Sequence, residues 1–333
     1  MFSPERYTAA RQGAVVFDLS GRGRILLTGA DRLTYLQGLL TNDVAALTPG
    51  TGCYAALLTP QGRMISDMRV FETGEAALLD VPGERGPEVA SHLANFIFSE
   101  DAAVQDASES LAHLLVLGAA SAKALKVDSL RPFENRKVRV AGMEVTAAGN
   151  DDYSVPAIDM FVGTVHKPMV IAALVEAGVS TIDEEVVETL RIEAGTPRFG
   201  VDMDQDTIPL EAGIEQRAIS MTKGCYVGQE VIIRVLHRGH GRVARKLVGL
   251  LFPEDAPVPA RGERLHAGDR DIGMITSASS SPALGRPIAL GYVHRDFAAP
   301  GTALEAGGAA RQPVTVAALP FADLPRSAGL HGP

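Results

Sequence analysis

A run of eight residues, Lys223-Gly224-Cys225-Tyr226-Val227-Gly228-Gln229-Glu230, carries residue types that suit thiol chemistry. Cys225 is one of only two cysteines in the chain, and Lys223 lies two residues before it. A thiol close to an ammonium group is partly deprotonated, and the thiolate is both a nucleophile and a metal ligand. The flanking glycines allow backbone conformations that other residues avoid, so the sulfur can be approached. The octapeptide therefore predicts a reactive site at Cys225.

The alternative for Cys225 is a buried cysteine that packs as a small hydrophobic residue. We expect that role for Cys53, which lies among Tyr54, Ala55 and Ala56. Two cysteines cannot form a disulfide framework or, alone, a four-ligand zinc site. One cysteine also cannot hold an iron–sulfur cluster without other ligands. We therefore predict no resident metal site.

Two acidic residues occupy positions that suggest use in a site. Residues 63–71 form a strand candidate in which Asp67 shares one face with Ile65, Arg69 and Phe71. A lone acid on a strand is usually solvated, so both roles stay open for Asp67. Glu193 ends a predicted helix, where its charge opposes the helix dipole. It is either a site residue or the ion-pair partner of Arg198.

Two polar segments remain ambiguous. Asn42-Asp43 follows a predicted helix and is typical of a turn. Between Glu230 and Glu254 the chain carries five basic residues and no acid: Arg234, Arg238, Arg242, Arg245 and Lys246. In an acidic protein this stretch is a candidate anion site, although a solvated linker explains it equally well. His237 and His240 on the same glycine-rich stretch are weak evidence for a metal.

The elements that must position these residues alternate irregularly. Strands are expected at 24–28, 53–59, 63–71, 76–81, 111–117, 138–148 and 158–162, and helices after Asp31 and at 84–98, 119–125, 167–177, 183–193 and 229–236. From residue 242 onward, short strands separated by proline and glycine predict a small all-β barrel. Strands and helices without a regular βαβ order indicate an α+β fold. No glycine-rich phosphate loop is present.

Length and composition limit the class of protein. At 333 residues the chain is expected to form two or three domains, and 46% hydrophobic with 21% charged residues is typical of globular proteins. A net charge of −9 argues against coating bulk nucleic acid. No apolar run reaches the length of a membrane span, and the first residues lack the order of a signal peptide. We therefore expect a cytoplasmic protein that does not contact membranes.

The octapeptide resembles the signature of the YgfZ family of folate-binding proteins, relatives of mitochondrial iron–sulfur assembly factors and of the glycine-cleavage T protein, an aminomethyltransferase. Other stretches fit in the same order across nearly the whole chain: residues 35–44, the meander through Gly62-Arg63-Met64-Ile65-Ser66-Asp67, Leu190-Arg191-Ile192-Glu193-Ala194-Gly195, and Pro209-Leu210-Glu211-Ala212-Gly213.

The resemblance implies two α+β lobes around a central channel for a reduced folate such as tetrahydrofolate. Residues 1–240 would form these lobes, with 45–100 inserted in the other lobe. Residues 241–320 would form the barrel, and 321–333 a loose tail. By resemblance, Glu193 would accept hydrogen bonds from the pterin and Asp67 would lie near the nitrogens that carry the one-carbon unit. Asn42 and Arg198 are the other folate-binding candidates.

The leading hypothesis from the sequence is a tetrahydrofolate-binding accessory factor for assembly or repair of iron–sulfur proteins, with secondary effects on tRNA modification. Cys225, activated by Lys223, would transiently hold iron, sulfur or a client's thiol, while Gln229 and Glu230 shape the site. T proteins lack the octapeptide, whereas YgfZ-like proteins do not generally keep the acid on the meander, and this chain has both. Asp67 therefore supports an alternative, a folate-dependent aminomethyl or one-carbon transferase or demethylase. An RNA-binding module is a third hypothesis, weakened by the scarcity of aromatic residues near the basic stretch.

Overall fold

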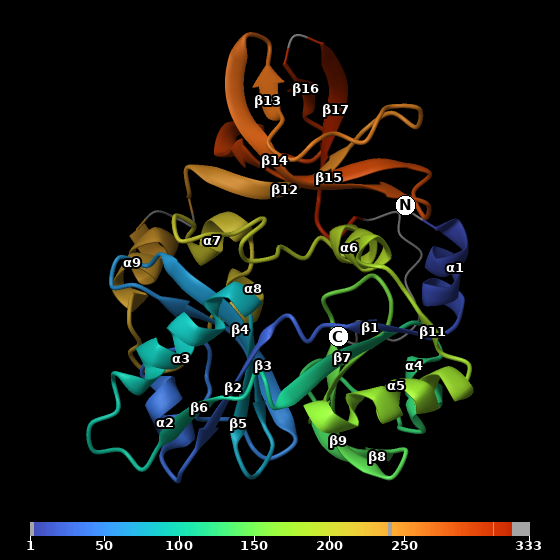
Figure 1. Ribbon diagram of the computed structural model, residues 1–333. Coiled ribbons are helices and arrows are strands. Elements are labelled where there is room, and N and C mark those ends of the chain that lie inside the picture. The colour runs from blue at the N-terminus through green and yellow to red at the C-terminus, as the bar shows by residue number, and fades with distance from the viewer. Residues whose placement is uncertain (1–2, 239–241, 309, 322–333) are drawn as a thin grey trace.

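Three β-sheets organise the computed structural model, which describes residues 3–238, 242–308 and 310–321. Two open sheets belong to two α+β lobes that lie side by side, and the third closes into a barrel that lies across both (Figure 1). The expected α+β fold with a C-terminal β-barrel is confirmed.

The first lobe contains a six-stranded sheet. In order of pairing, its strands are β11 (Ser180–Thr181), β1 (Val15–Asp18), β7 (Leu111–Leu117), β10 (Ala157–Gly163), β9 (Met143–Asn150) and β8 (Asn135–Val140). Alternate residues of β7 pack on opposite faces. Leu114 and Val116 contact the side of α4 (Ser121–Leu125) and α5 (Lys167–Glu176), whereas Leu115 and Leu117 contact that of α1 (Pro4–Gln12) and α6 (Glu184–Glu193). The sheet is therefore covered on both faces.

The second lobe contains a five-stranded sheet. In order of pairing, its strands are β3 (Thr51–Leu58), β4 (Met64–Glu72), β5 (Ala77–Val81), β2 (Gly23–Thr28) and β6 (Ala103–Asp106). One face packs on α2 (Arg32–Gln37) and α3 (Gly86–Ala94) through residues such as Met68 and Val70. The β3–β4 pairing shifts between Leu57 and Leu58, and Met64 packs in a different core from Met68.

The second lobe is inserted in the first. β1 of the six-stranded sheet leads into β2 of the other sheet, and the chain returns from β6 to β7. The inserted lobe is longer than the expected residues 45–100. Its sheet also includes β2, which precedes this range, and β6, which follows it, because β2 pairs with both β5 and β6. Every element between residues 23 and 106 belongs to this lobe.

A turn of π-helix (Arg234–Arg238) extends α9 (Gln229–Ile233), and the barrel follows after a linker. In order of pairing, its strands are β12 (Arg245–Leu251), β15 (Arg286–His294), β14 (Arg270–Ser281), β13 (Arg264–Ala267), β16 (Ala303–Gly307) and β17 (Arg311–Ala317). The short helices α7 (Pro209–Ala212) and α8 (Glu215–Ala218) lie between barrel and lobes (Figure 1). Phe321, where a loose tail was expected to begin, is buried beside Ile192 and Leu290, and residues 322–333 lie outside the described part.

The face of β4 that is turned away from α2 and α3 packs against the first lobe. Phe71 contacts Phe161 of β10, with ring centroids 5.7 Å apart, and Arg69 pairs with Asp152, which follows β9. Since Asp67 shares this face, the fold directs its side chain toward the junction between the lobes. Among the described residues, no helix combines the length and hydropathy needed to cross a membrane.

Candidate functional site

Asp67 is a buried acid with one oxygen left without a hydrogen-bond donor. Its side chain lies at the middle of β4, and the Tyr54 hydroxyl donates to Oδ2 at 2.7 Å. Within the described part of the chain, Oδ1 has no hydrogen-bond partner. Burial raises the pKa of Asp67, although Arg22 and Arg69 oppose the shift. Because a buried polar atom without a partner is costly, Oδ1 is suited to accept a proton or hydrogen bond from a ligand or water.

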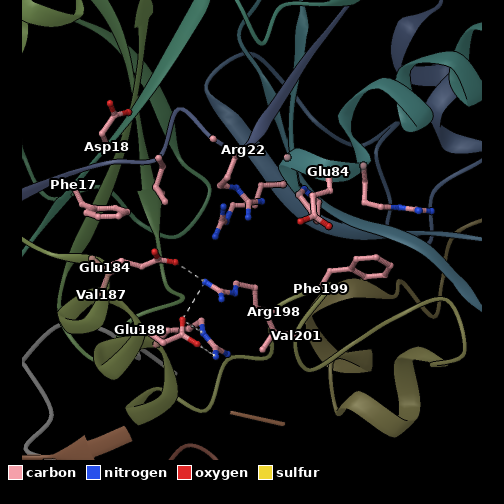
Figure 2. A pocket seen from close by; sticks show the side chains of 18 of the residues that line it. Phe17, Asp18, Arg22, Glu84, Glu184, Val187, Glu188, Arg198, Phe199 and Val201 are labelled. Atoms are coloured by element: carbon pink, nitrogen blue, oxygen red, sulfur yellow. Dashed lines mark hydrogen bonds and ion pairs between the residues drawn. The ribbon is translucent and has the colours of Figure 1, made fainter. Parts of the chain in front are cut away.

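Asp67 faces a small cavity of about 50 Å³ whose wall also includes Tyr54, Tyr153 and Phe199. A larger cavity of about 480 Å³ adjoins it, because both share Arg22, Arg69, Tyr153, Arg191, Arg198 and Phe199. Figure 2 shows the larger space between Arg22 and Glu84 on one side and Arg198, Glu188 and Glu184 on the other. Both lobes and the loop after α6 therefore contribute walls to one two-part pocket.

A buried ion-pair network forms the rear of this pocket and ties the two lobes together. Arg69 pairs through one Nη with Asp80 of β5 and through the other with Asp152 of the first lobe. Arg217 also donates to Asp152, at 2.8 Å. Burial alone would raise the pKa values of Asp80 and Asp152, but the neighbouring guanidinium groups hold both well below the usual range. The network therefore supplies fixed charges beside Asp67.

His113 of β7 extends the network into the first lobe. Its Nε2 lies 2.8 Å from Asp159, and its Nδ1 lies 3.6 Å from Asp80 of the other sheet. Burial alone would lower the pKa of His113, but the two carboxylates raise it. His113 therefore lies between two acids from different sheets and extends the network from one lobe to the other.

The loop that carries Arg198 and Phe199 is held by the barrel. Asp202 Oδ1 accepts hydrogen bonds from Thr276 at 2.5 Å and Ser277 at 2.7 Å, both on β14. Its Oδ2 accepts from Arg191 at 2.8 Å and from the backbone N–H of Arg198 at 3.0 Å. The barrel thus fixes one wall of the pocket without lining it.

Comparison with known proteins assigns the chain to a family. Residues 3–223 match the GCVT N-terminal domain, and residues 245–323 match the glycine cleavage T-protein C-terminal barrel domain. The chain belongs to the glycine cleavage T-protein family. That match is to the T-protein family as a whole, and the narrower resemblance to the YgfZ branch rests on the octapeptide.

Relatives of this family are similar over most of their length. The chain is 31% identical to the aminomethyltransferase of Streptomyces coelicolor, covering 95% of this chain and 88% of that protein. It is 28% identical to the aminomethyltransferase of Bacillus subtilis, covering 90% and 85%. The crystal structure of glycine cleavage system aminomethyltransferase T from Bartonella henselae superposes with a TM-score of 0.87 over 97% of this chain and 90% of that one. At 19% identity, that likeness concerns the fold alone.

Glu193, expected to bind the pterin, uses its carboxylate within the protein. Oε1 accepts from Tyr7 at 2.7 Å and Ser281 at 2.6 Å, and Oε2 accepts from Arg11 at 3.0 Å and Ser154 at 2.8 Å. A carboxylate has about four acceptor positions, so these donors fill it. Glu193 also lines neither cavity. Glu193 thus joins α6, α1, the first lobe and the barrel, and its contact with the pterin stays a prediction.

Asn42 has a similar structural role. Its Nδ2 donates to the carbonyls of Tyr54 and Arg217 at 2.8 and 2.9 Å, and its Oδ1 accepts from the N–H of Asp43. These bonds brace β3, which carries Tyr54, against the chain near α8. Asn42 lines neither cavity, so it supports the site from outside.

Lys223, expected to activate Cys225, directs its ammonium elsewhere. Nζ donates to the carbonyls of Gln37, Leu40 and Asn42 at 2.7, 2.6 and 2.9 Å, which uses all three of its hydrogens. Burial lowers the pKa of Lys223 to about 8. This geometry provides the thiol with no N–H from Lys223, because the ammonium closes the end of α2.

The rest of the octapeptide is exposed or half-buried, except for Tyr226, which is buried. Cys225 and Glu230 are exposed, Glu230 pairs with Arg234 one turn along the helix, and the N–H of Gln229 donates to the carbonyl of Tyr226. None of Cys225, Gln229 and Glu230 lines either cavity. No group of three metal-ligating side chains occurs among the described residues. Cys225 therefore shares neither cavity with Asp67.

The basic stretch is partly paired. Arg245 contacts Glu211 at 3.1 Å and lies over the ring of Tyr292, in addition to the Arg234–Glu230 pair. Residues 239–241, including His240, lie outside the described part, as do the side chains of His237 and Arg238. Of the sequence candidates, Asp67 and Arg198 are the two that the pocket brings together.

Several pocket residues were not identified from the sequence, among them Arg22, Tyr54, Asp152, Tyr153 and Phe199. One sequence signal was available for Arg22, which lies between Gly21 and Gly23 in the link that joins the two sheets. The others come from separate segments that pattern alone does not bring together.

Proposed function

We propose that the chain is a folate-dependent one-carbon transferase that passes a one-carbon unit from an amine donor to a reduced folate. The observation that carries this proposal is the unpartnered Oδ1 of buried Asp67 at the inner end of a large pocket. The family and its aminomethyltransferase relatives support it.

The residues of the larger cavity suit a tetrahydrofolate. Its volume of about 480 Å³ lies within the usual range for small-molecule sites. Phe17, Tyr153 and Phe199 provide aromatic and apolar surface for the rings of the folate. The Arg198 side chain is 40% exposed, and its contacts with Glu184 and Glu188 are long, at 3.6 and 3.3 Å, so its N–H groups can turn to the carboxylates of the glutamyl tail.

Asp67 would act on protons. Tyr54 fixes Oδ2, which leaves Oδ1 to accept the proton of a folate nitrogen as that nitrogen bonds to the one-carbon unit. The bond between this unit and the nitrogen of the donor breaks in the same transfer, and the released amine takes up the proton. A raised pKa brings the carboxylate closer to the working pH, where a general base is most effective. Arg22 and Arg69 limit that shift, so the ionised form needed for catalysis remains accessible.

The test is transfer from a methylamine-type donor to tetrahydrofolate by wild type and by Asp67→Asn. We expect the variant to lose about 100-fold or more of kcat, because the amide cannot accept the proton, while tetrahydrofolate affinity changes little. Wild-type activity should fall as pH decreases through the raised pKa of Asp67. Full activity in Asp67→Asn would rule out this role.

A second function rests on the exposure of Cys225. An accessible thiol in the octapeptide suits an accessory role toward iron–sulfur proteins, with reduced folate bound in the separate pocket. Cells carrying Cys225→Ala would then lose iron–sulfur enzyme activity under oxidative stress, whereas folate binding by the purified variant would stay unchanged. Complete complementation by Cys225→Ala would exclude the thiol role and leave the transferase proposal intact.

A further inference from the structure

Arg22 differs from Arg69 and Arg191, which also line the small cavity, in how its guanidinium is used. Arg69 gives both Nη groups to Asp80 and Asp152. Arg191 uses all three nitrogens on Glu188, Asp202, Ser277 and the carbonyl of Thr196. The side-chain hydrogen bonding of Arg22, within the described part of the chain, is confined to Nε, which donates to Asp80 Oδ1 at 2.7 Å. Its Nη end is therefore available to a ligand.

The position of Arg22 makes that end useful. Arg22 lines both cavities and so lies where the small one opens into the large one. Figure 2 shows its side chain directed into the open space. Because Asp80 holds Nε in place, the planar fork is oriented in advance for two parallel hydrogen bonds to a carboxylate. An oriented fork loses little side-chain entropy when the ligand arrives.

Among the described residues, the small cavity contains one unpartnered acceptor, on a carboxylate, and unpartnered donors, on a guanidinium. Oδ1 of Asp67 lacks a donor, and the Nη groups of Arg22 lack an acceptor, although both residues line the same space. A volume of about 50 Å³ exceeds the roughly 10–15 Å³ that one water needs, so it has room for a few heavy atoms. A small molecule with an amine at one end and a carboxylate at the other matches both the size and the charges.

We propose that Arg22 binds the carboxylate of the one-carbon donor, so that the donor is a small amino acid whose amine lies at Asp67. This inference rests on the proposed transferase function and names the class of its donor. It concerns binding alone. The folate tail is the other source of a carboxylate, but Arg198, whose side chain is 40% exposed against 21% for Arg22, is better placed for it.

The experiment compares two probes by calorimetry on the full chain saturated with tetrahydrofolate. N-methylglycine carries the carboxylate, and N-methylglycinamide has the same amine without it. We expect wild type to prefer N-methylglycine by roughly 10- to 100-fold, the effect of a charge-assisted bidentate contact. Arg22→Gln should reduce the preference to less than about threefold, and Arg22→Lys should keep part of it.

Arg32→Gln is the matched control. Arg32 also pairs with a buried acid of the same lobe, Glu72 at 2.7 Å, but lines neither cavity. It should lower the melting temperature about as much as Arg22→Gln while keeping the probe preference. Equal wild-type affinity for the two probes, or an unchanged preference in Arg22→Gln, would overturn the inference.

A third comparison separates the two carboxylate sources. If Arg22→Gln instead weakened tetrahydrofolate binding and left tetrahydropteroate binding unchanged, the carboxylate would belong to the folate and the donor assignment would fail. Because these readouts are affinities, they are independent of whether Asp67→Asn abolishes transfer. Failure of the donor inference and failure of the proposed function therefore give different results.

Discussion

At the scale of single residues, unused hydrogen-bonding capacity separates ligand-binding candidates from structural ones. Glu193 and Asp67 are both buried acids at positions that the family resemblance connects with folate. Four donors from three parts of the chain fill the acceptor positions of Glu193, whereas Asp67 receives one donor and keeps Oδ1 available. The same criterion distinguishes Arg22 from Arg69 and Arg191.

We expect Glu193→Gln to lower stability and to leave folate affinity nearly unchanged. The amide cannot accept four hydrogen bonds, and the Arg11 contact loses its charge, so unfolding should become easier by about 3 kcal/mol. Denaturant unfolding gives this value, and titration of tetrahydrofolate gives the affinity of the folded variant. A stable Glu193→Gln that binds folate about tenfold more weakly would instead return Glu193 to the pterin site.

The sequence predicted only part of this site, for a physical reason. Alternation along a strand correctly grouped Asp67 with Arg69 and Phe71, because strand faces are set locally. Hydrogen-bond occupancy is not local, since the partners of Glu193 include Tyr7 and Ser281, 186 and 88 positions away. The assembly of the lobes and the barrel therefore decides which acid has all its acceptor positions occupied and which can still accept a hydrogen bond from a ligand.

At the scale of elements, Lys223 shows how a motif that resembles a reactive site can be structural. The helix α2 ends at Gln37, earlier than its apolar pattern predicts, and the chain then turns toward β3. The carbonyls of Gln37, Leu40 and Asn42 converge on one ammonium, which replaces the partners that a longer helix would supply. Strand and helix types were predictable here from periodicity, but the early end of α2 depends on a side chain 186 residues away.

We expect Lys223→Met to destabilise the protein by about 1–3 kcal/mol, because it leaves these carbonyls without a donor while keeping the aliphatic volume. Cys225→Ala is the matched comparison, since Cys225 is exposed and its loss should change stability by less than about 0.5 kcal/mol. Thermal unfolding of both variants measures the difference. If Lys223→Met kept wild-type stability and slowed the alkylation of Cys225, Lys223 would be the thiol's activator after all.

At the scale of the whole molecule, the pocket depends on ion pairs that join lobes formed by different segments. Arg69 links the five-stranded sheet to Asp152 of the first lobe, and His113 links β7 to Asp80 across the same junction. On the opposite side, Asp202 connects the barrel to the loop that carries Arg198. The composition and patterning predicted the three parts, whereas their joints consist of charged residues that pattern assigns to solvent.

The pH dependence of stability tests the joint between the lobes, with the neighbours Asp152 and Asp151 as a matched pair. Asp152 contacts both Arg69 and Arg217, whereas Asp151 contacts Arg217 alone. Arg69 and Arg217 outweigh burial and lower the pKa of Asp152, whereas burial raises the pKa of Asp151. A depressed carboxyl pKa adds stability that is complete above the unfolded pKa near 4 and is lost as pH falls toward the folded one.

Asp152→Asn should therefore lower the free energy of unfolding by about 3–5 kcal/mol at pH 7, because it leaves Arg69 buried with a single partner. It should also flatten the loss of stability of the wild type below about pH 4, since one of the groups responsible is gone. Asp151→Asn should cost less at pH 7, and it should not flatten the acid slope, because a raised carboxyl pKa opposes the loss of stability in acid. Denaturant unfolding at several pH values measures both slopes. Equal effects of the two variants would show that Asp152 does not join the lobes. The ion-pair network beside Asp67 would then not be what holds the pocket together.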